Sequence, residues 1–157
     1  MIITHASAER ITKISSSMGD ALRGCLFFAA EGNTYNLTGE CNFQYNLDVS
    51  EDKIIEARRF FFEHDFNDEI ILDVLNALRN ELNLDCDDET MSTIIDESDD
   101  ISDYVSSDDL AVSSWLVQQY QGILAHKLGY DCVESFDEQG TVYVAYCVGR
   151  KLEEVEC

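Results

Sequence analysis

The sequence is poor in basic side chains and in long apolar runs. It contains 10 Lys and Arg residues against 32 Asp and Glu, so its formal net charge is −22. Direct binding to duplex DNA needs cations that displace counterions from the phosphates, and this charge excludes it. No apolar stretch approaches the roughly 18 residues of a membrane span. The N-terminus also lacks the basic segment and longer apolar run of a secretory signal, so we expect neither a membrane helix nor export.

The chain also has no proline, and its cysteines follow no recognisable spacing. The missing proline points to no function. The six cysteines include no C-x-x-C pair and stand at positions 25, 41, 86, 132, 147 and 157. Such scattered cysteines are typical of buried thiols in intracellular proteins, so we predict neither a zinc site nor a disulfide framework. An EF-hand alignment from Asp85 puts Thr90 where the loop needs glycine, which favours a solvated acidic surface over a calcium site.

Charge is distributed unevenly along the chain. Residues 1–60 hold six basic and eight acidic side chains, whereas residues 61–157 hold four basic and 24 acidic ones. No Lys or Arg occurs between Arg79 and Lys127. A chain of 157 residues, of which 45% are hydrophobic, can bury one core, and we expect a single domain. That domain joins a nearly neutral first part to a strongly anionic second part.

Apolar periodicity predicts strands near both ends and helices between them. The predicted strands cover residues 2–4, 25–29, 42–49, 131–136 and 141–147. The predicted helices are a turn from Ser7 to Ile14, a helix over 67–82 capped by Asn67, and a helix over 108–128 ended by Gly129. This order indicates an α+β fold with a split, mostly antiparallel sheet. Within a single domain of residues 1–157, we expect residues 1–60 and 129–157 to form the sheet halves, and 61–128 a helical acidic insertion.

Individual polar residues give no strong functional signal. The serines at 15–17 lack the G-x-S-x-G motif of a nucleophile elbow, and no glycine-rich loop resembles a phosphate cradle. His5 ends the first predicted strand, and Tyr35, Tyr45 and Glu138 follow later in the chain. Each of these residues alone is compatible with a structural role, as a strand-end histidine, a core tyrosine or a solvated turn residue.

The order of these residues, however, resembles the His-Tyr-Glu arrangement of ADP-ribosyltransferases, which cleave NAD and transfer ADP-ribose. The chemistry explains the residue types. Cleavage of the bond between nicotinamide and ribose develops positive charge on the ribose, which a nearby carboxylate stabilises. An aromatic ring can stack on nicotinamide, and a histidine can form a hydrogen bond with a ribose hydroxyl.

Longer segments resemble one family more closely, the small phage anti-CRISPR ADP-ribosyltransferases that act on the type I-F CRISPR surveillance complex. The matching segments are His5–Thr12, Leu26–Ala30, Asp52–Ile55 with the Phe-rich stretch after it, Trp115, Leu128–Tyr130 and Asp137–Thr141. The resemblance implies an NAD-dependent mono-ADP-ribosyltransferase in the bacterial host cytoplasm. It also implies that the enzyme modifies a protein subunit of the complex and blocks recognition of the protospacer-adjacent motif on target DNA.

The same resemblance assigns site residues by position. His5, Ala6 and Ser7 map to the NAD-ribose end, Phe28, Ala29 and Tyr35 to the nicotinamide pocket, and Asp137 and Glu138 to the catalytic acid, with the choice between the two acids left open. No metal is implied. Two positions depart from the expected pattern, because Ala6 replaces a hydroxyl residue and Phe136 stands where the wider superfamily has a carboxylate or amide.

The charge distribution fits this interpretation and two others. Arg10, Lys13 and Arg23 are the candidates to offset the pyrophosphate of NAD. Residues 61–130 form an anionic segment that would steer the protein toward a basic, nucleic-acid-binding surface. The same charge also fits a non-enzymatic DNA mimic that blocks such a surface stoichiometrically, or an acidic adaptor without catalysis. The enzyme needs NAD and turns over, whereas a mimic needs neither.

Overall fold

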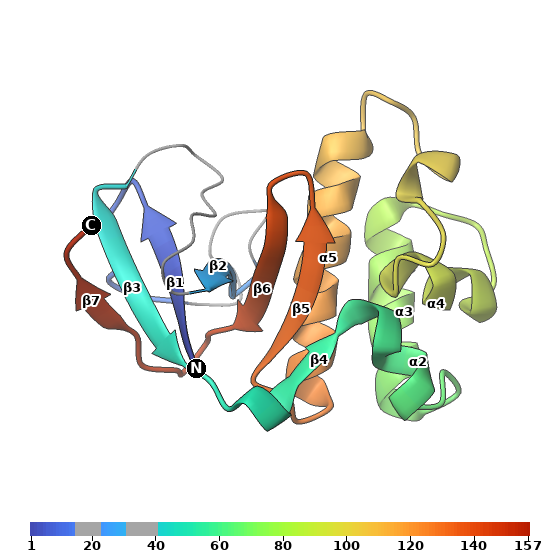
Figure 1. Cartoon of the computed structure of the whole chain (residues 1–157). Coiled ribbons are helices and arrows are strands. Elements are labelled where there is room, and N and C mark those ends of the chain that lie inside the picture. The colour runs from blue at the N-terminus through green and yellow to red at the C-terminus, as the bar shows by residue number, and fades with distance from the viewer. Residues whose placement is uncertain (15–22, 31–40) are drawn as a thin grey trace.

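A seven-stranded sheet runs through the protein. The computed structural model describes residues 1–14, 23–30 and 41–157 (Figure 1). The strands are β1 (Ile2–Ser7), β2 (Cys25–Ala30), β3 (Phe43–Asp48), β4 (Ile54–Glu56), β5 (Cys132–Asp137), β6 (Gly140–Tyr146) and β7 (Glu153–Val155). Their spatial order is β4-β5-β6-β2-β1-β3-β7, and among these described strands only β4 and β5 pair in parallel. The predicted α+β class with a mostly antiparallel sheet is confirmed.

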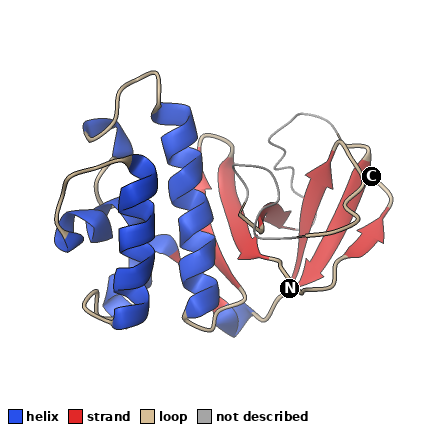
Figure 2. Ribbon diagram, turned by 180° about the vertical axis from the view of Figure 1, so that it is seen from behind, coloured by secondary structure: helices blue, strands red, loops and turns tan. Residues whose placement is uncertain are grey.

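The described α-helices lie between β4 and β5 in the chain and to one side of the sheet (Figure 2). They are α2 (Phe60–Glu63), α3 (Glu69–Leu82), α4 (Asp88–Ile95) and α5 (Leu110–Lys127), with short 3-10 turns at η1 (Glu51–Lys53), η2 (Ala57–Arg59) and η3 (Ile101–Asp103). Helix α5 packs on β5 and β6, and α3 and α4 pack on α5. Strands β1, β3 and β7 lie away from these helices (Figure 1).

The starts of α3 and α4 follow from local sequence. Asp68, one residue after the predicted cap, accepts a hydrogen bond from the Ile70 N–H at 2.9 Å. The carboxylate of Asp87 accepts one from the Thr90 N–H at 2.8 Å. Each cap satisfies a backbone donor that the first helical turn leaves without a partner. Apolar side chains spaced three and four apart then join the core beside α5; they are Ile71, Val74, Leu75, Leu78, Met91, Ile94 and Ile95.

Helix α5 confirms the predicted helix over 108–128 but not its single apolar stripe. Val112, which was expected in that stripe, is 67% exposed, whereas three glutamines at 118, 119 and 121 are buried. The reason is that the sheet, α3 and α4 enclose the helix on several sides. At Gly122 an added Cβ would lie 2.8 Å from Val144 Cγ1, so the missing side chain lets α5 approach β6 closely.

Strand β1 is longer than predicted, and the helical turn predicted between Ser7 and Ile14 is absent from the described residues of that segment. The strand pairs with β3 along its whole length, from Ile2 opposite Asp48 to Ser7 opposite Phe43. The Ser7 hydroxyl does not cap a helix; it donates to the Glu9 carbonyl at 2.6 Å. Pairing with β3 is a tertiary interaction, and it outweighs the local preference for a turn of helix.

The prediction that the six cysteines are buried thiols outside any disulfide framework is wrong for two of them. Cys41 and Cys157 form a disulfide, with their Cα atoms 6.3 Å apart. The pairing of β3 with β7 brings together these residues, which are 116 positions apart in the chain. The other cysteines are free, and burial raises the pKa of both Cys132 and Cys147 to about 12. Those two thiols are therefore protonated and unreactive at neutral pH.

The two faces of the sheet carry separate cores. Along β2, Phe27 and Ala29 point toward α3 and α5, whereas Leu26 and Phe28 point to the opposite face, as strand alternation requires. On that opposite face they meet other apolar residues, which include Ile3, Leu47, Val49, Cys132, Tyr143 and Ala145. The second core thus joins strands from both termini and carries the residues around His5.

Candidate functional site

The strand register brings His5 into a row of aromatic and acidic residues. In neighbouring pairs, Tyr45 lies opposite His5, Tyr143 opposite Phe28, and Glu134 opposite Tyr143. The His5 and Phe28 rings close the row, with their centroids 5.7 Å apart. Residues directly opposite each other on neighbouring strands project from the same face. The row therefore crosses β5, β6, β2, β1 and β3 on the face away from α5.

His5 is held in a defined tautomer. Its Nδ1 lies 2.7 Å from the Phe27 carbonyl oxygen. A carbonyl can only accept, so Nδ1 carries the proton and Nε2 of the neutral ring is an acceptor. Burial lowers the pKa of His5 below 6.5, against the smaller raising effect of the Phe27 carbonyl. At neutral pH this histidine can therefore accept a hydrogen bond from a hydroxyl group, as the ribose of NAD would require.

The residues beside His5 take different positions. Ala6 lies opposite Gln44, and its neighbour Ser7 turns its hydroxyl to the backbone of Glu9. Phe28 is fully buried beside His5, whereas Ala29 points to the other face, toward α5. Phe28 and Ala29 thus cannot both present their side chains to one pocket. Tyr35, the third residue predicted for the nicotinamide pocket, lies outside the described residues.

The two candidate acids differ in how firmly they are held. Asp137 and Gly140 pair across the turn between β5 and β6, and Gly140 has a φ of +107°. Asp137 Oδ2 accepts from Gln118 Nε2 on α5 at 3.1 Å, and its Oδ1 accepts from the Gln139 N–H at 2.9 Å. Glu138 is exposed at the tip of the turn. Helix α5 therefore fixes Asp137 and leaves the Glu138 carboxylate in solvent.

A third acid, Glu97, lies close to this turn and was not found from the sequence. Its Oε2 accepts from the Ser135 hydroxyl on β5 at 3.1 Å. Burial raises the pKa of Glu97, the Gln121 and Ser135 side chains lower it through hydrogen bonds, and the nearby charges of Arg58 and Asp137 have opposite, smaller effects. No local pattern marks Glu97, because the turn after α4 meets β5 only in the folded chain. The end of β5 is thus fixed by side chains from two helical segments.

The cations predicted to meet the NAD pyrophosphate do not gather in one place. Arg10 forms an ion pair with Glu154 at 3.2 Å and lies over the Phe43 ring. Arg23 is paired with Glu81 of α3. Lys13 instead lines a cavity of about 210 Å³, together with Arg150 from the segment after β6.

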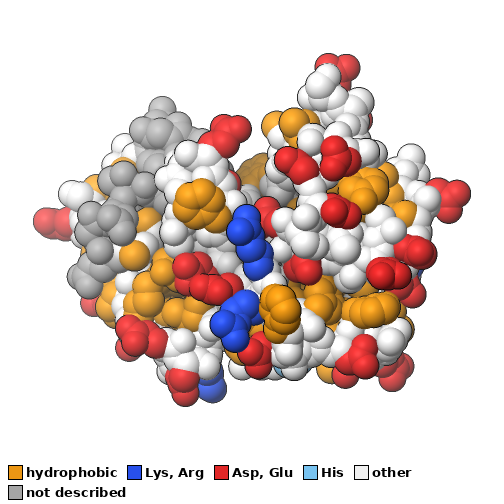
Figure 3. Space-filling model, turned by 45° about the vertical axis from the view of Figure 1, so that its right-hand side comes forward, with side chains coloured by type: hydrophobic (Ala, Val, Ile, Leu, Met, Phe, Trp, Pro, Cys, Tyr) orange, Lys and Arg blue, Asp and Glu red, His pale blue; other side chains and the backbone are white. Residues whose placement is uncertain are grey.

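Acidic side chains dominate the surface of the helical part (Figure 3). They are prominent on the right of this view, and the basic side chains visible there lie near its middle and lower left.

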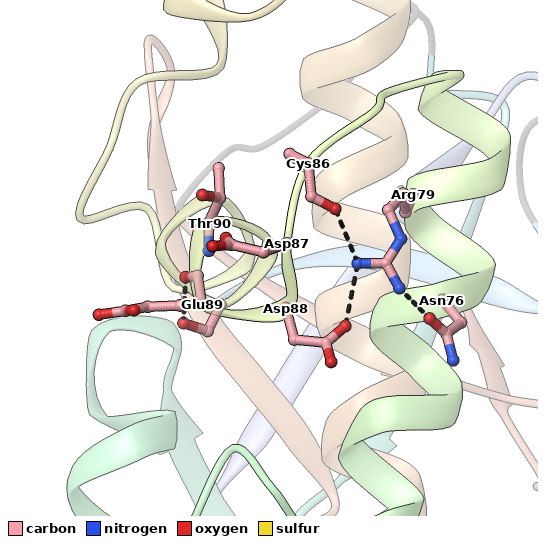
Figure 4. Close-up of polar contacts among 8 residues, drawn as sticks. Asn76, Arg79, Cys86, Asp87, Asp88, Glu89 and Thr90 are labelled. Carbon is pink, nitrogen blue, oxygen red and sulfur yellow. Dashed lines mark hydrogen bonds and ion pairs between the residues drawn. The ribbon is translucent and has the colours of Figure 1, made fainter.

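Arg79 is the last cation before the long basic-free segment. It donates to the Cys86 carbonyl at 3.1 Å and to the Asp88 carboxylate at 2.9 Å, and it also contacts Asn76 (Figure 4). Arg79 thereby fastens the start of α4 to α3.

In the described part of the chain, no helix is long and apolar enough to cross a membrane. Within the same residues, no group of three or more His, Cys, Asp and Glu side chains is placed to hold a metal ion.

Comparisons with known proteins place the chain in a family. The sequence model of the family described as "Anti-CRISPR Type I-F ADP-ribosyltransferase AcrIF11" matches residues 2–154. A solved structure titled "Crystal structure of an anti-CRISPR protein" has the same fold, with a TM-score of 0.62 at 22% identity, over 99% of this chain and 95% of that one. No curated protein sequence matches. The family match extends from the first strand to the last and includes the row around His5 and the acidic turn. This chain therefore belongs to the AcrIF11 family of anti-CRISPR type I-F ADP-ribosyltransferases.

Proposed function

We propose that this protein transfers ADP-ribose from NAD to a protein subunit of the type I-F CRISPR surveillance complex in the host cytoplasm. The modification would prevent that complex from recognising the protospacer-adjacent motif on target DNA. The observation that carries the proposal is the family match over residues 2–154. The fold supports part of the predicted site, because β1 and β2, which hold the predicted residues around His5 and Phe28, pair side by side. Asp137 contacts Gln118 of α5 and therefore lies on the other face of the sheet from His5.

His5 is suited to hold the ribose of NAD. Its Nδ1–H is committed to the Phe27 carbonyl, so the ring cannot rotate freely. Its Nε2 can accept from a ribose hydroxyl while the ring is neutral, and its lowered pKa favours that neutral form. Fixing one ribose in this way limits the poses available to the scissile bond.

Asp137 is the better candidate for the acid of the reaction. NAD supplies both the ADP-ribosyl group and the nicotinamide leaving group. Loss of nicotinamide develops positive charge on the ribose, and a carboxylate stabilises it best when it is already oriented. Asp137 meets that condition through Gln118 and the turn backbone, whereas Glu138 is exposed at the turn tip. Glu138 remains free to contact the acceptor protein.

The acidic surface indicates that the partner protein carries a basic surface. Nucleic-acid-binding subunits expose Lys and Arg, and a strongly anionic protein approaches them faster at low ionic strength. We assign the exposed acids of the helical segment to that approach; among them are Asp85, Glu89, Asp103 and Asp108. The segment contains no Lys or Arg between Arg79 and Lys127 that would oppose the attraction.

The deciding experiment is intact-mass spectrometry of the purified surveillance complex. The complex is incubated with a substoichiometric amount of the protein, with and without NAD. We expect an NAD-dependent gain of one ADP-ribose on one subunit, in molar excess over the added protein. Asp137→Asn and Glu138→Gln then separate the two candidate acids in the same assay.

The alternative is a non-enzymatic DNA mimic, and the basic-free segment between Arg79 and Lys127 favours it as much as it favours steering. A mimic would inhibit DNA binding without NAD and only at one protein per complex. An unchanged subunit mass together with stoichiometric, NAD-independent inhibition would overturn the proposed transferase and support the mimic.

A further inference from the structure

A cavity of about 210 Å³ opens on the sheet face that carries His5. Its walls come from the segment after β1, from β3 and from the segment after β6. Ile11, Ile14 and Leu152 line it with apolar surface, and they also pack against the second core. The Tyr45 hydroxyl accepts from the Ile11 N–H at 2.7 Å, which ties the segment after β1 to β3. The cavity is thus built by segments that are far apart in the chain.

The charge lining this cavity is opposite to that of the protein. The whole chain holds 32 acidic residues, yet no described residue that lines the cavity is acidic, and two of them, Lys13 and Arg150, are basic. A second hollow, beside the disulfide, shows the contrast, because it contains Glu154 and Glu156 as well as Arg10. In a protein of charge −22, a cavity walled by cations and lacking carboxylates favours an anionic ligand.

Neither cation of the cavity is neutralised by the carboxylates described around it. Arg150 Nη1 donates to the Asp131 carbonyl at 2.6 Å, which orients the guanidinium without cancelling its charge. The Asp131 carboxylate turns to the Ser50 N–H at 2.8 Å instead. Lys13 forms no ion pair with any described residue, whereas Arg10 and Arg23 are both paired with glutamates.

Size and position restrict the ligand further. Pockets for complete drug-sized ligands hold roughly 300–1,000 Å³, so this cavity accommodates part of a dinucleotide and not all of it. Tyr45 belongs to its wall and lies directly opposite His5 in the β1–β3 pairing. The cavity thus lies on the same sheet face as His5 and one strand away from it. In NAD, the anionic group next to both riboses is the diphosphate.

We propose that this cavity binds the diphosphate of NAD through Lys13 and Arg150. The inference rests on the proposed function for the identity of the co-substrate, and it deepens that function by assigning its anionic subsite. Arg150 can offer its fork of N–H donors to phosphate oxygens, and Lys13 acts as a point charge. Arg10 and Arg23, which the sequence also suggested, are not part of this subsite.

The test is calorimetric binding of ADP-ribose, ADP and adenosine to the full-length protein and its variants. Lys13→Gln and Arg150→Gln remove one cation each, and Lys13→Glu reverses one charge. Lys151→Gln is the matched control, because Lys151 is exposed, adjoins Arg150 and does not line the cavity. We expect about tenfold weaker ADP-ribose binding for Arg150→Gln and a smaller loss for the exposed Lys13, with adenosine unaffected. Inorganic pyrophosphate, which we expect to compete with ADP-ribose in the wild type but not in Lys13→Glu, tests whether the site recognises the diphosphate itself.

The outcomes separate this inference from the proposed function. If ADP-ribose binding by Lys13→Glu and Arg150→Gln equals that of the wild type, the subsite is wrong even where NAD-dependent transfer is intact. If the wild type binds ADP-ribose with the expected dependence on both cations but transfers nothing, the subsite stands and the transferase proposal fails. Since Arg150→Gln also loses the contact to Asp131, its thermal midpoint is measured alongside. The surface variant Lys13→Glu decides the matter if Arg150→Gln does not fold.

Discussion

The sheet built by the termini and the helical part between β4 and β5 differ most in how they use charge. In the sheet region, Arg10 is paired with Glu154, whereas Lys13 and Arg150 line a cavity and form no ion pair with a described carboxylate. In the helical region carboxylates outnumber cations, and several serve the fold itself, as Asp68, Asp87 and Asp100 do at helix starts. An acidic segment is therefore not uniformly a binding surface, because part of its charge stabilises helices.

We propose that the sheet region carries the chemistry and that the helical region carries the approach to the partner. The sharpest test of this comparison is at the turn between β5 and β6. We expect Asp137→Asn to lower the rate of ADP-ribose transfer by about 100-fold, because an oriented carboxylate next to developing positive charge is lost. Glu138→Gln should cost far less. The measurement is single-turnover transfer followed by mass spectrometry. A larger loss from Glu138→Gln than from Asp137→Asn would reverse the assignment of the acid.

Charge reversal tests the helical region. A variant with Asp85, Glu89, Asp103 and Asp108 changed to Lys should modify the surveillance complex about tenfold more slowly at low salt, because attraction to a basic partner is reduced. Its affinity for ADP-ribose should be unchanged. The matched control reverses four exposed acids of the sheet region, Glu51, Asp52, Glu153 and Glu156. Equal losses in both variants would show that net charge matters and its location does not.

The pH dependence of NAD binding tests His5. The pKa of this histidine is lowered by burial, so the neutral acceptor form is retained at pH 6.5 and above. Binding should weaken as the pH falls through the lowered pKa, because protonation of Nε2 removes the acceptor. We expect a severalfold loss, measured by calorimetry between pH 5 and 8. His5→Asn should bind weakly with little pH dependence over that range. A wild-type affinity that depends on pH no more than that of His5→Asn, at every pH at which the protein stays folded, would contradict the role of His5.

The smallest effect concerns stability within the helical region. Arg79→Met should lower the free energy of unfolding by about 1 kcal/mol, because Asp88 and the Cys86 carbonyl lose a charged donor. Arg59→Met is the control, since among the described residues Arg59 is paired with Glu63 alone, four residues on and exposed. Its loss should cost less than about 0.5 kcal/mol. Urea titrations of both variants measure the difference. If the two losses are equal, the link between α3 and α4 contributes no more than a surface pair.

Local sequence predicted most of the elements. The strand over 42–49 alternates, the helix over 67–82 carries its own stripe, and the hairpin has a turn sequence, so each was found to within a few residues. The wrong predictions concern residues whose conformation or partner depends on segments far away in the chain. Ser7 extends β1 because β3 pairs with it, and Cys41 bonds Cys157 because β7 pairs with β3. Glu97 and Arg150 were missed for the same reason, since their partners lie on other elements.

The sequence by itself determined the class of the fold, the separation of charge and the family resemblance, because periodicity, composition and short motifs are local properties. Only the tertiary structure decided which residues meet. It placed His5 against Phe27 and Phe28, oriented Asp137 from α5, and put Lys13 and Arg150 in the lining of one cavity without a described carboxylate. Those contacts depend on strand register and on how a helix packs over a sheet, and the chain acquires both only when it buries its two cores.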